Sequence, residues 1–311
     1  MILTLTPNPA FDRIQTVPGF GPGQVCRASS LKLSAGGKGV NVARAIHPLG
    51  GTALCTGFLG GHTGRLFAEM AEQDGIQAQW TWISGETRVS PVILCPETGE
   101  TTVINEAGPT VTPQDGERLL ADVHTAAARA TMACVCGSLP PGLPPAFAGE
   151  IIRTLQAIRI PVFVDSSGET LRAAAQACPA VLKINSAEAA ALLGWPEFQG
   201  TATAFQAARA IRASGVPRVV LTLGREGAIL LGENGAWSAT PPPLKVLSTI
   251  GSGDSFLAGL AVSIQKGLSD PEALRSAVAS GSANALSTGG GVFPRQDYER
   301  ILAGVTVNAI G

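Results

Sequence analysis

Residues 249–260, TIGSGDSFLAGL, place one carboxylate behind two glycines and in front of an apolar run. The apolar residues recur at helical spacing, which predicts a helix that begins near Asp254. Gly251 and Gly253 would let backbone N–H groups turn inward, and the helix dipole adds positive potential there. Such a turn could stabilise a developing anion while Asp254 accepts a proton as a general base. A simple helix cap would explain the same pattern.

A second glycine-rich turn lies at residues 34–45, SAGGKGVNVARA, and also leads into a predicted helix. Its spacing fits neither a Walker A loop nor the dinucleotide-binding fingerprint. Glycines before a helix allow close backbone approach to a ligand, and Asn41 would face a hydroxyl of a polyol one turn later. The alternative is a glycine turn with a solvated lysine.

Two further polar residues directly follow predicted strands. Asp12 ends NPAFD after the first strand, and Ser138 lies in GSLPPG after the strand ACVC. Ligands of α/β proteins bind at the carboxyl ends of parallel strands, so both side chains could contact one there. Asp12 could hold two vicinal hydroxyls. Each is also an ordinary turn residue.

Two segments could contact a metal ion or phosphate groups. In residues 183–190, KINSAEAA, Glu188 falls in the first turn of a helix, where it could cap the helix or hold water around Mg²⁺. Residues 222–228, TLGREGA, read as a hairpin whose backbone N–H groups could meet nucleotide phosphates.

The elements around these motifs alternate between short apolar strands and amphipathic helices. This order predicts an α/β fold with a mostly parallel central sheet and helices on both faces. Residues 10–35 and 80–106 break the rhythm with β-rich pieces, and we expect them to form a small antiparallel lid in which Trp80 and Trp82 share one face. The large domain would comprise residues 1–9, 36–79 and 107–311.

The composition excludes several classes of protein. The 311 residues carry a net charge of −1 with no basic cluster, which argues against a nucleic-acid surface. No apolar stretch reaches membrane-spanning length, and the N-terminus does not resemble a signal peptide. The six cysteines match no zinc spacing, and we expect a reduced, cytoplasmic protein.

Together, the motifs resemble the PfkB branch of the ribokinase family of sugar kinases over nearly the whole chain. In chain order they are NPAFD, GGKGVNVAR, GFLGG, GETR, GSLPPG, DSSGE, KIN followed by Glu188, LGREGA and GSGD. GSLPPG, DSSGE and GETR are typical of the group that phosphorylates hexose phosphates. The resemblance implies a ribokinase-like fold with a β-sheet lid that commonly forms a homodimer contact.

The resemblance also implies roles for individual residues. Asp254 would be the catalytic base, and Gly251, Ser252 and Gly253 the anion hole. The sugar phosphate would contact Asp12, Gly36, Gly37, Asn41, Arg88 and Ser138, with Arg27 and Lys38 as further phosphate contacts. ATP would contact Lys183, Asn185, Thr222, Gly224, Gly227 and Asn284. Mg²⁺ would be held through water by Asn185 and Glu188, and a K⁺ site could lie near Ser248 and Ile250.

Two positions depart from the family pattern. Ser252 replaces the usual alanine of G-A-G-D, and Ile184 replaces the usual proline of K-P-N. Both changes keep the backbone and the flanking polar residues, so we expect activity to persist. The hydroxyl of Ser252 either adds a donor to the anion hole or has no effect.

The expected reaction is ATP-dependent phosphorylation of a ketohexose phosphate, with fructose 1-phosphate as the first choice. Tagatose 6-phosphate and fructose 6-phosphate fit the same groups. A nicotinamide-dependent oxidoreductase is a rival, but no glycine fingerprint follows the first strand. A non-catalytic sugar-phosphate sensor would not need Asp254.

Overall fold

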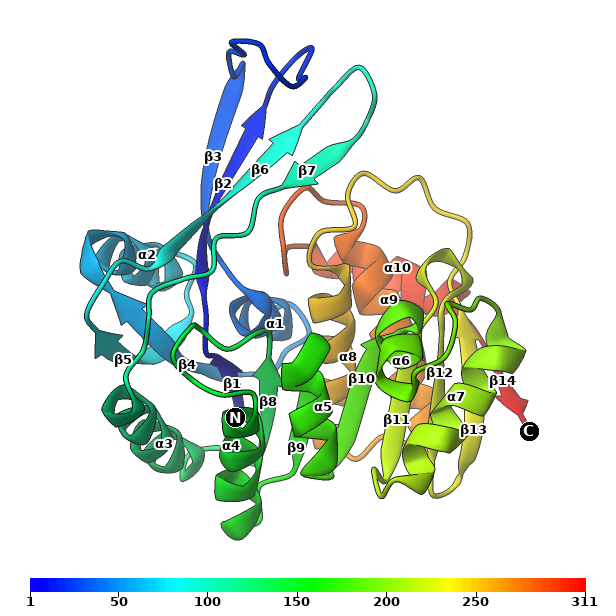
Figure 1. Ribbon diagram of the computed structural model, residues 1–311. Helices are drawn as coiled ribbons and strands as arrows, with labels where there is room; N and C mark the ends of the chain where they lie inside the picture. Colours follow the sequence, from blue (N-terminus) through cyan, green and yellow to red (C-terminus); the bar gives the residue numbers. More distant parts are fainter.

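A ten-stranded sheet runs through the larger part of the computed structural model, which describes residues 1–311 (Figure 1). The strand order is β14-β13-β12-β11-β10-β9-β8-β1-β4-β5. In this order, neighbouring strands from β11 through β10, β9, β8, β1 and β4 to β5 are parallel. The pairs β11-β12, β12-β13 and β13-β14 are antiparallel. Their bounds are β1 Ile2–Thr6, β4 Ala53–Gly60, β5 Gln77–Ile83, β8 Met132–Cys136, β9 Val162–Asp165, β10 Val181–Asn185, β11 Arg218–Thr222, β12 Ala228–Gly232, β13 Gly235–Thr240 and β14 Thr306–Ile310.

Helices cover both faces of this sheet, as predicted (Figure 1). One layer contains α3 Pro113–Ala127, α4 Ala146–Ala157, α5 Gly168–Gln176, α6 Ser186–Leu193 and α7 Thr201–Ala213. The other contains α1 Lys38–Ile46, α2 Gly61–Gln73, α8 Ser252–Gln265, α9 Asp270–Asn284 and α10 Arg295–Gly304. A 3₁₀ turn, η1 Gly224–Glu226, links β11 to β12. No helix combines the length and the hydropathy needed to span a bilayer.

Two-sided burial explains why the central strands are continuously apolar. In β8, Ala133 and Val135 enter the core beneath α3 to α5, while Cys134 and Cys136 enter the core beneath α1 and α8. The two cysteines therefore share a face, as their spacing predicts, and both are buried free thiols.

A separate four-stranded sheet, the lid, projects from the large sheet (Figure 1). Its order is β3-β2-β6-β7, with bounds β2 Ala10–Thr16, β3 Ser30–Gly36, β6 Arg88–Leu94 and β7 Thr101–Val103. The prediction of a wholly antiparallel sheet is wrong, because β2 and β6 are parallel. They are parallel because the chain crosses the large sheet through β4 and β5 before it returns to the lid.

The prediction that the strand with both tryptophans belongs to the lid is also wrong. This strand is β5, the parallel edge strand of the large sheet, in which Trp80 lies opposite Gly57 of β4. Trp80 packs edge-on against Phe67 of α2 at 5.6 Å between ring centroids. Thr81 donates to Asp122 of α3 at 2.6 Å. Helices cover this edge strand only in part, and its alternating pattern reflects that partial cover.

Candidate active site

The candidate site lies where the carboxyl ends of β1, β8, β9 and β10 meet the N-termini of α1 and α8. Parallel topology brings these ends to one edge of the sheet, although the residues are far apart in sequence. Hydrogen bonds link Asn41 to Asp254, and Lys38 and Lys183 to Asp165. The lid strands β2 and β3 supply Asp12 and Gly36 to the same region.

Asp254 lies buried in the first turn of α8, and its side chain does not cap that helix. Asn41 Nδ2 donates a hydrogen bond to Asp254 Oδ2 at 2.8 Å. Arg44 Nη1 in turn donates to Asn41 Oδ1 at 3.0 Å, which fixes the orientation of the amide. The sequence assigned Asn41 to a sugar hydroxyl, whereas here its amide nitrogen orients the carboxylate of Asp254.

The backbone before Asp254 requires glycine at its N-cap. Gly251 has φ 73°, in the left-handed region, and a Cβ built there would lie 2.4 Å from Gly290 Cα. The turn therefore packs backbone against backbone and leaves Ser252 and Gly253 as the first residues of α8. Ser252 N already donates to Thr249 O at 3.2 Å. Gly253 therefore supplies the N–H of this pair that lacks a partner, as is usual in the first turn of a helix.

Burial raises the pKa of Asp254 to about 6, and the negative charge of Asp165 acts in the same direction. The charge of Lys38, the hydrogen bond from Asn41 and the charge of Lys183 oppose that rise in pKa. A base with a pKa just below neutrality is ionised at pH 7 and still basic enough to accept a proton.

Asp165 joins the two lysines. Its Oδ1 accepts from Lys38 Nζ at 2.6 Å, and its Oδ2 accepts from Lys183 Nζ at 2.5 Å. A Cβ built on Gly253 would lie 2.9 Å from Lys183 Nζ. The structure therefore places the ammonium group of Lys183 beside the first turn of α8, and Lys38 is tied to the same carboxylate.

On the lid side, Asp12 lies against the Gly36 backbone. A Cβ built on Gly36 would lie 2.0 Å from Asp12 Oδ2. Burial raises the pKa of Asp12 to about 7, while Arg44 and Arg88 oppose the rise. The guanidinium group of Arg88 is held in place by two hydrogen bonds. It donates to the backbone oxygen of Asn8 at 2.9 Å and to the backbone oxygen of Glu106 at 3.0 Å.

Gly37 joins this region to α1, since it is the N-cap residue of that helix with φ 110°. Two other predicted phosphate contacts, Arg27 and Ser138, take no part in the hydrogen bonds described above. Arg27 is exposed in the connection between β2 and β3, and Ser138 is exposed just after β8. Neither side chain makes a hydrogen bond in the structure, so their roles as phosphate contacts stay predictions.

The nucleotide side contains a cavity of about 610 Å³ that reaches the first turn of α8. Among the predicted residues, it is lined by Thr222, Gly224, Gly227, Ser252 and Gly253. The Pro241–Pro243 connector and Phe256 of α8 provide part of its apolar wall. One cavity thus joins the predicted nucleotide loop to the predicted anion hole.

Asn284 does not reach this cavity, and its predicted nucleotide contact is not supported. Its side chain is completely buried and accepts hydrogen bonds from Gly291 N at 2.8 Å and from Ser255 Oγ at 3.1 Å. Its amide donates to Ile250 O at 2.7 Å. Asn284 therefore fixes the chain on both sides of the Gly251 turn rather than meeting a ligand.

Asn185 and Glu188 form a capping box on α6. Asn185 Oδ1 accepts from Glu188 N at 2.8 Å, and Glu188 Oε2 accepts from Asn185 N at 2.9 Å. The capping interpretation is therefore correct. Glu188 Oε1 has no hydrogen-bond partner, and a free hard oxygen suits a Mg²⁺ ion that keeps most of its waters.

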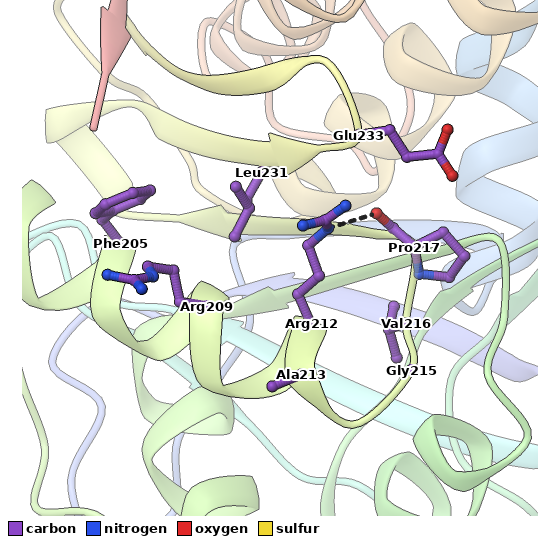
Figure 2. A pocket seen from close by; sticks show the side chains of 9 residues that line it. All are labelled: Phe205, Arg209, Arg212, Ala213, Gly215, Val216, Pro217, Leu231 and Glu233. Atoms are coloured by element: carbon purple, nitrogen blue, oxygen red, sulfur yellow. Dashed lines mark hydrogen bonds between the residues drawn. The ribbon is translucent and has the colours of Figure 1, made fainter.

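Figure 2 shows another hollow, of about 500 Å³, between α7 and β12. It lies at the start of β11 and the end of β12, and therefore at the edge of the sheet opposite the candidate site. Arg212 donates to Pro217 O at 3.3 Å there, and Glu233 supplies an opposing charge. None of the predicted site residues lines this hollow.

Two residues of the site escaped the sequence-based assignment. Asp165 stands at the end of the buried strand VFVD, which is the same signal that indicated Asp12 and Ser138. Arg44 lies in the GGKGVNVAR motif, but its reach back to Asn41 and Gly290 depends on the tertiary fold.

The fold and the placement of these groups define a ribokinase-like carbohydrate kinase. The sequence matches the pfkB family carbohydrate kinases over residues 8–296, and the chain belongs to that family. It is 33% identical to 1-phosphofructokinase of Escherichia coli K12 over 98% of this chain and 97% of that protein. The 1-phosphofructokinase of Vibrio cholerae is 32% identical over 99% and 97%, respectively.

A solved structure supports the same assignment. Escherichia coli phosphofructokinase-2, crystallised in complex with potassium, matches with a TM-score of 0.90 at 30% identity, over 97% of this chain and 98% of that chain. Membership of the family implies ATP as phosphoryl donor with a divalent cation, and a sugar phosphate as acceptor.

Replacing Gly36 with alanine tests the sugar side. The new Cβ must displace Asp12, so we expect kcat/KM for the sugar phosphate to fall about 10²-fold, as for an ångström-scale misplacement. Gly289→Ala is the matched control, since its Cβ would meet only ordinary contacts of 3.4 Å or more, and should stay within about twofold of the unsubstituted enzyme. Unchanged kinetics for Gly36→Ala would remove Asp12 from the sugar site.

The pH dependence of kcat tests the base. Below about pH 6 the raised pKa of Asp254 makes its carboxyl neutral, and a neutral carboxyl cannot accept the proton. We therefore expect kcat at saturating sugar to fall about tenfold per pH unit below that value. Asp12→Asn removes the second titrating carboxyl and should leave this acid limb in place. A flat kcat profile down to pH 5 would contradict the assignment of Asp254.

Proposed function

We propose that this chain transfers the γ-phosphoryl group of MgATP to the C6 hydroxyl of fructose 1-phosphate, giving fructose 1,6-bisphosphate and MgADP. The observation that carries the proposal is the position of Asp254. Its carboxylate lies in the first turn of α8, between the lid-side groups around Asp12 and the cavity lined by Thr222 and Gly227. A base at that boundary can activate a sugar hydroxyl toward a nucleotide.

The chemical step follows from this placement. Asp254 accepts the proton as the sugar oxygen bonds to the γ-phosphorus in line with the bond to the β,γ-bridging oxygen, which breaks to release ADP. Amides of the first turn of α8 and the ammonium group of Lys183 stabilise charge on the transferring group. Closure of the lid over the sugar excludes water. Mg²⁺, when bound near Glu188, supplies further charge neutralisation on the phosphates.

Binding of the sugar phosphate rests on the lid side. Asp12 accepts hydrogen bonds from sugar hydroxyls, while Arg88 supplies positive charge for the phosphate. Arg27 and Ser138 are free to turn toward it. Fructose 1-phosphate is the preferred substrate because curated relatives similar over nearly the full chain are 1-phosphofructokinases. Fructose 6-phosphate is the second candidate. Escherichia coli phosphofructokinase-2, which is 29% identical to this chain, has a crystal structure in complex with that sugar phosphate.

We further propose a homodimer through the lid. The lid carries four exposed apolar residues, namely Val25, Leu31, Val103 and Ile104. A second copy would cover this surface. One structural relative, phosphofructokinase-2 of Escherichia coli, has a tetrameric inhibited form. A K⁺ requirement stays a prediction, because Ser248 Oγ and Ile250 O already accept hydrogen bonds from Ile250 N and Asn284 Nδ2.

A coupled assay of ADP production tests the function. With MgATP, we expect the highest kcat/KM for fructose 1-phosphate, ahead of fructose 6-phosphate and tagatose 6-phosphate. A higher value for either of the others would transfer the assignment to that sugar. Calorimetric binding of a sugar phosphate without ADP production would instead identify a sensor.

A further inference from the structure

Asp165 is a completely buried carboxylate whose two oxygens are both occupied by lysine ammonium groups. Burial acts to raise its pKa, but the charges of Lys183 and Lys38 outweigh that effect and hold the pKa below its usual range. The group is therefore an anion, and its burial is tolerated because both oxygens are paired.

The two lysines come from different parts of the fold. Lys183 is the middle residue of β10, the strand next to β9, whereas Lys38 is the first residue of α1. The side chain of Lys183 is only 6% exposed, while that of Lys38 is 36% exposed. Two lysines held by one carboxylate leave a net charge of +1 beside the first turn of α8, where Lys183 Nζ lies 2.9 Å from a Cβ built on Gly253.

We propose that Asp165 is a positioning residue for phosphoryl transfer, which holds the ammonium groups of Lys38 and Lys183 beside the first turn of α8 so that both face the phosphoryl group in transit. This inference rests on the proposed function. A lysine is a point charge on a flexible stem, and fixing it costs side-chain entropy. Asp165 fixes both before the substrates bind, so that cost does not fall on the transition state.

Two other roles for Asp165 lead to different outcomes. A purely structural ion pair would affect unfolding but not chemistry. A metal ligand would need a free carboxylate oxygen, and both oxygens of Asp165 already accept hydrogen bonds from lysines.

Asp165 also affects the base through its charge. The charged and titratable groups around Asp254 are Asp165 from β9, Lys183 from β10, Lys38 from α1, Cys136 from β8 and Asp12 from β2. The negative charge of Asp165 raises the pKa of Asp254, whereas both lysines lower it. Removing the charge of Asp165 should therefore lower that pKa and leave the lysines unopposed.

The test compares Asp165→Asn with Asp270→Asn. Asp270 is buried, pairs with the part-exposed Arg218 at 2.8 Å and lies outside the site, so its variant reports the loss of a buried carboxylate's ion pair alone. For Asp165→Asn we expect kcat to fall about 10²-fold, more than the sugar KM changes, and the acid limb of kcat to move to lower pH. Asp270→Asn should unfold at lower urea concentration and keep kcat and its pH profile.

A double-mutant cycle with Lys38→Met covers the case in which Asp165→Asn folds poorly. If Asp165 acts through the lysines, Asp165→Asn should cost less in kcat when Lys38 is already methionine. Additive effects would overturn the inference. So would a kcat and acid limb like those of the unsubstituted enzyme in Asp165→Asn, or full rescue by raised Mg²⁺, which would indicate a metal ligand.

The same assays separate the two proposals. An unsubstituted enzyme that turns over none of the three ketohexose phosphates would refute the proposed function and, with it, the role of Asp165. An active enzyme whose Asp165→Asn variant is equally active would refute only the positioning role.

Discussion

The pairing of the buried Asp165 carboxylate with two lysines is the interaction on which the candidate site depends. An unpaired charge at this depth would be strongly unfavourable, so the buried Asp165 and Lys183 each require a partner. The pairing links the end of β9 and the middle of β10 to the start of α1. Burial raises the pKa of Asp254 to about 6, and Asp254 also lies close enough for all three charges to act on that pKa. The electrostatics of the base are therefore a property of the whole sheet edge rather than of one loop.

Hydrogen bonds from outside the substrate pocket maintain this arrangement. Arg44 holds the amide of Asn41, and Asn41 holds the carboxylate of Asp254. Asn284 fixes the chain at Ile250 and Ser255, on either side of the turn that starts α8, and also at Gly291. These contacts pre-order the base and the backbone amides before any substrate arrives, which is the form of organisation that phosphoryl transfer requires. The lid adds the groups around Asp12, so the site is complete only when both sheets contribute.

The sequence predicted the alternating elements, the parallel sheet and most of the site, because buried strands and helix starts have strong local signals. Asp254 and Lys183 follow such signals, and the structure places both at the same side of the large sheet, whereas Asp12, expected in a turn after the first strand, lies within the lid strand β2. The sequence could not show what each side chain bonds to. Asn41 and Asn284 were assigned to ligands, but tertiary contacts engage them with Asp254 and with the α8 turn. The tryptophan-bearing strand was misplaced because an edge strand of a large sheet and a strand of a lid share the same alternating pattern.

The central claim is that Asp254 is the base that activates the acceptor hydroxyl. The most direct measurement is the single-turnover rate of phosphoryl transfer from MgATP in Asp254→Asn, with sugar and nucleotide binding measured separately by calorimetry. Asparagine keeps the shape and the hydrogen-bonding distance but cannot accept the proton. We expect retained binding and a rate at least about 10²-fold slower, the usual contribution of a general base. A rate within about tenfold of the unsubstituted enzyme would contradict the central claim.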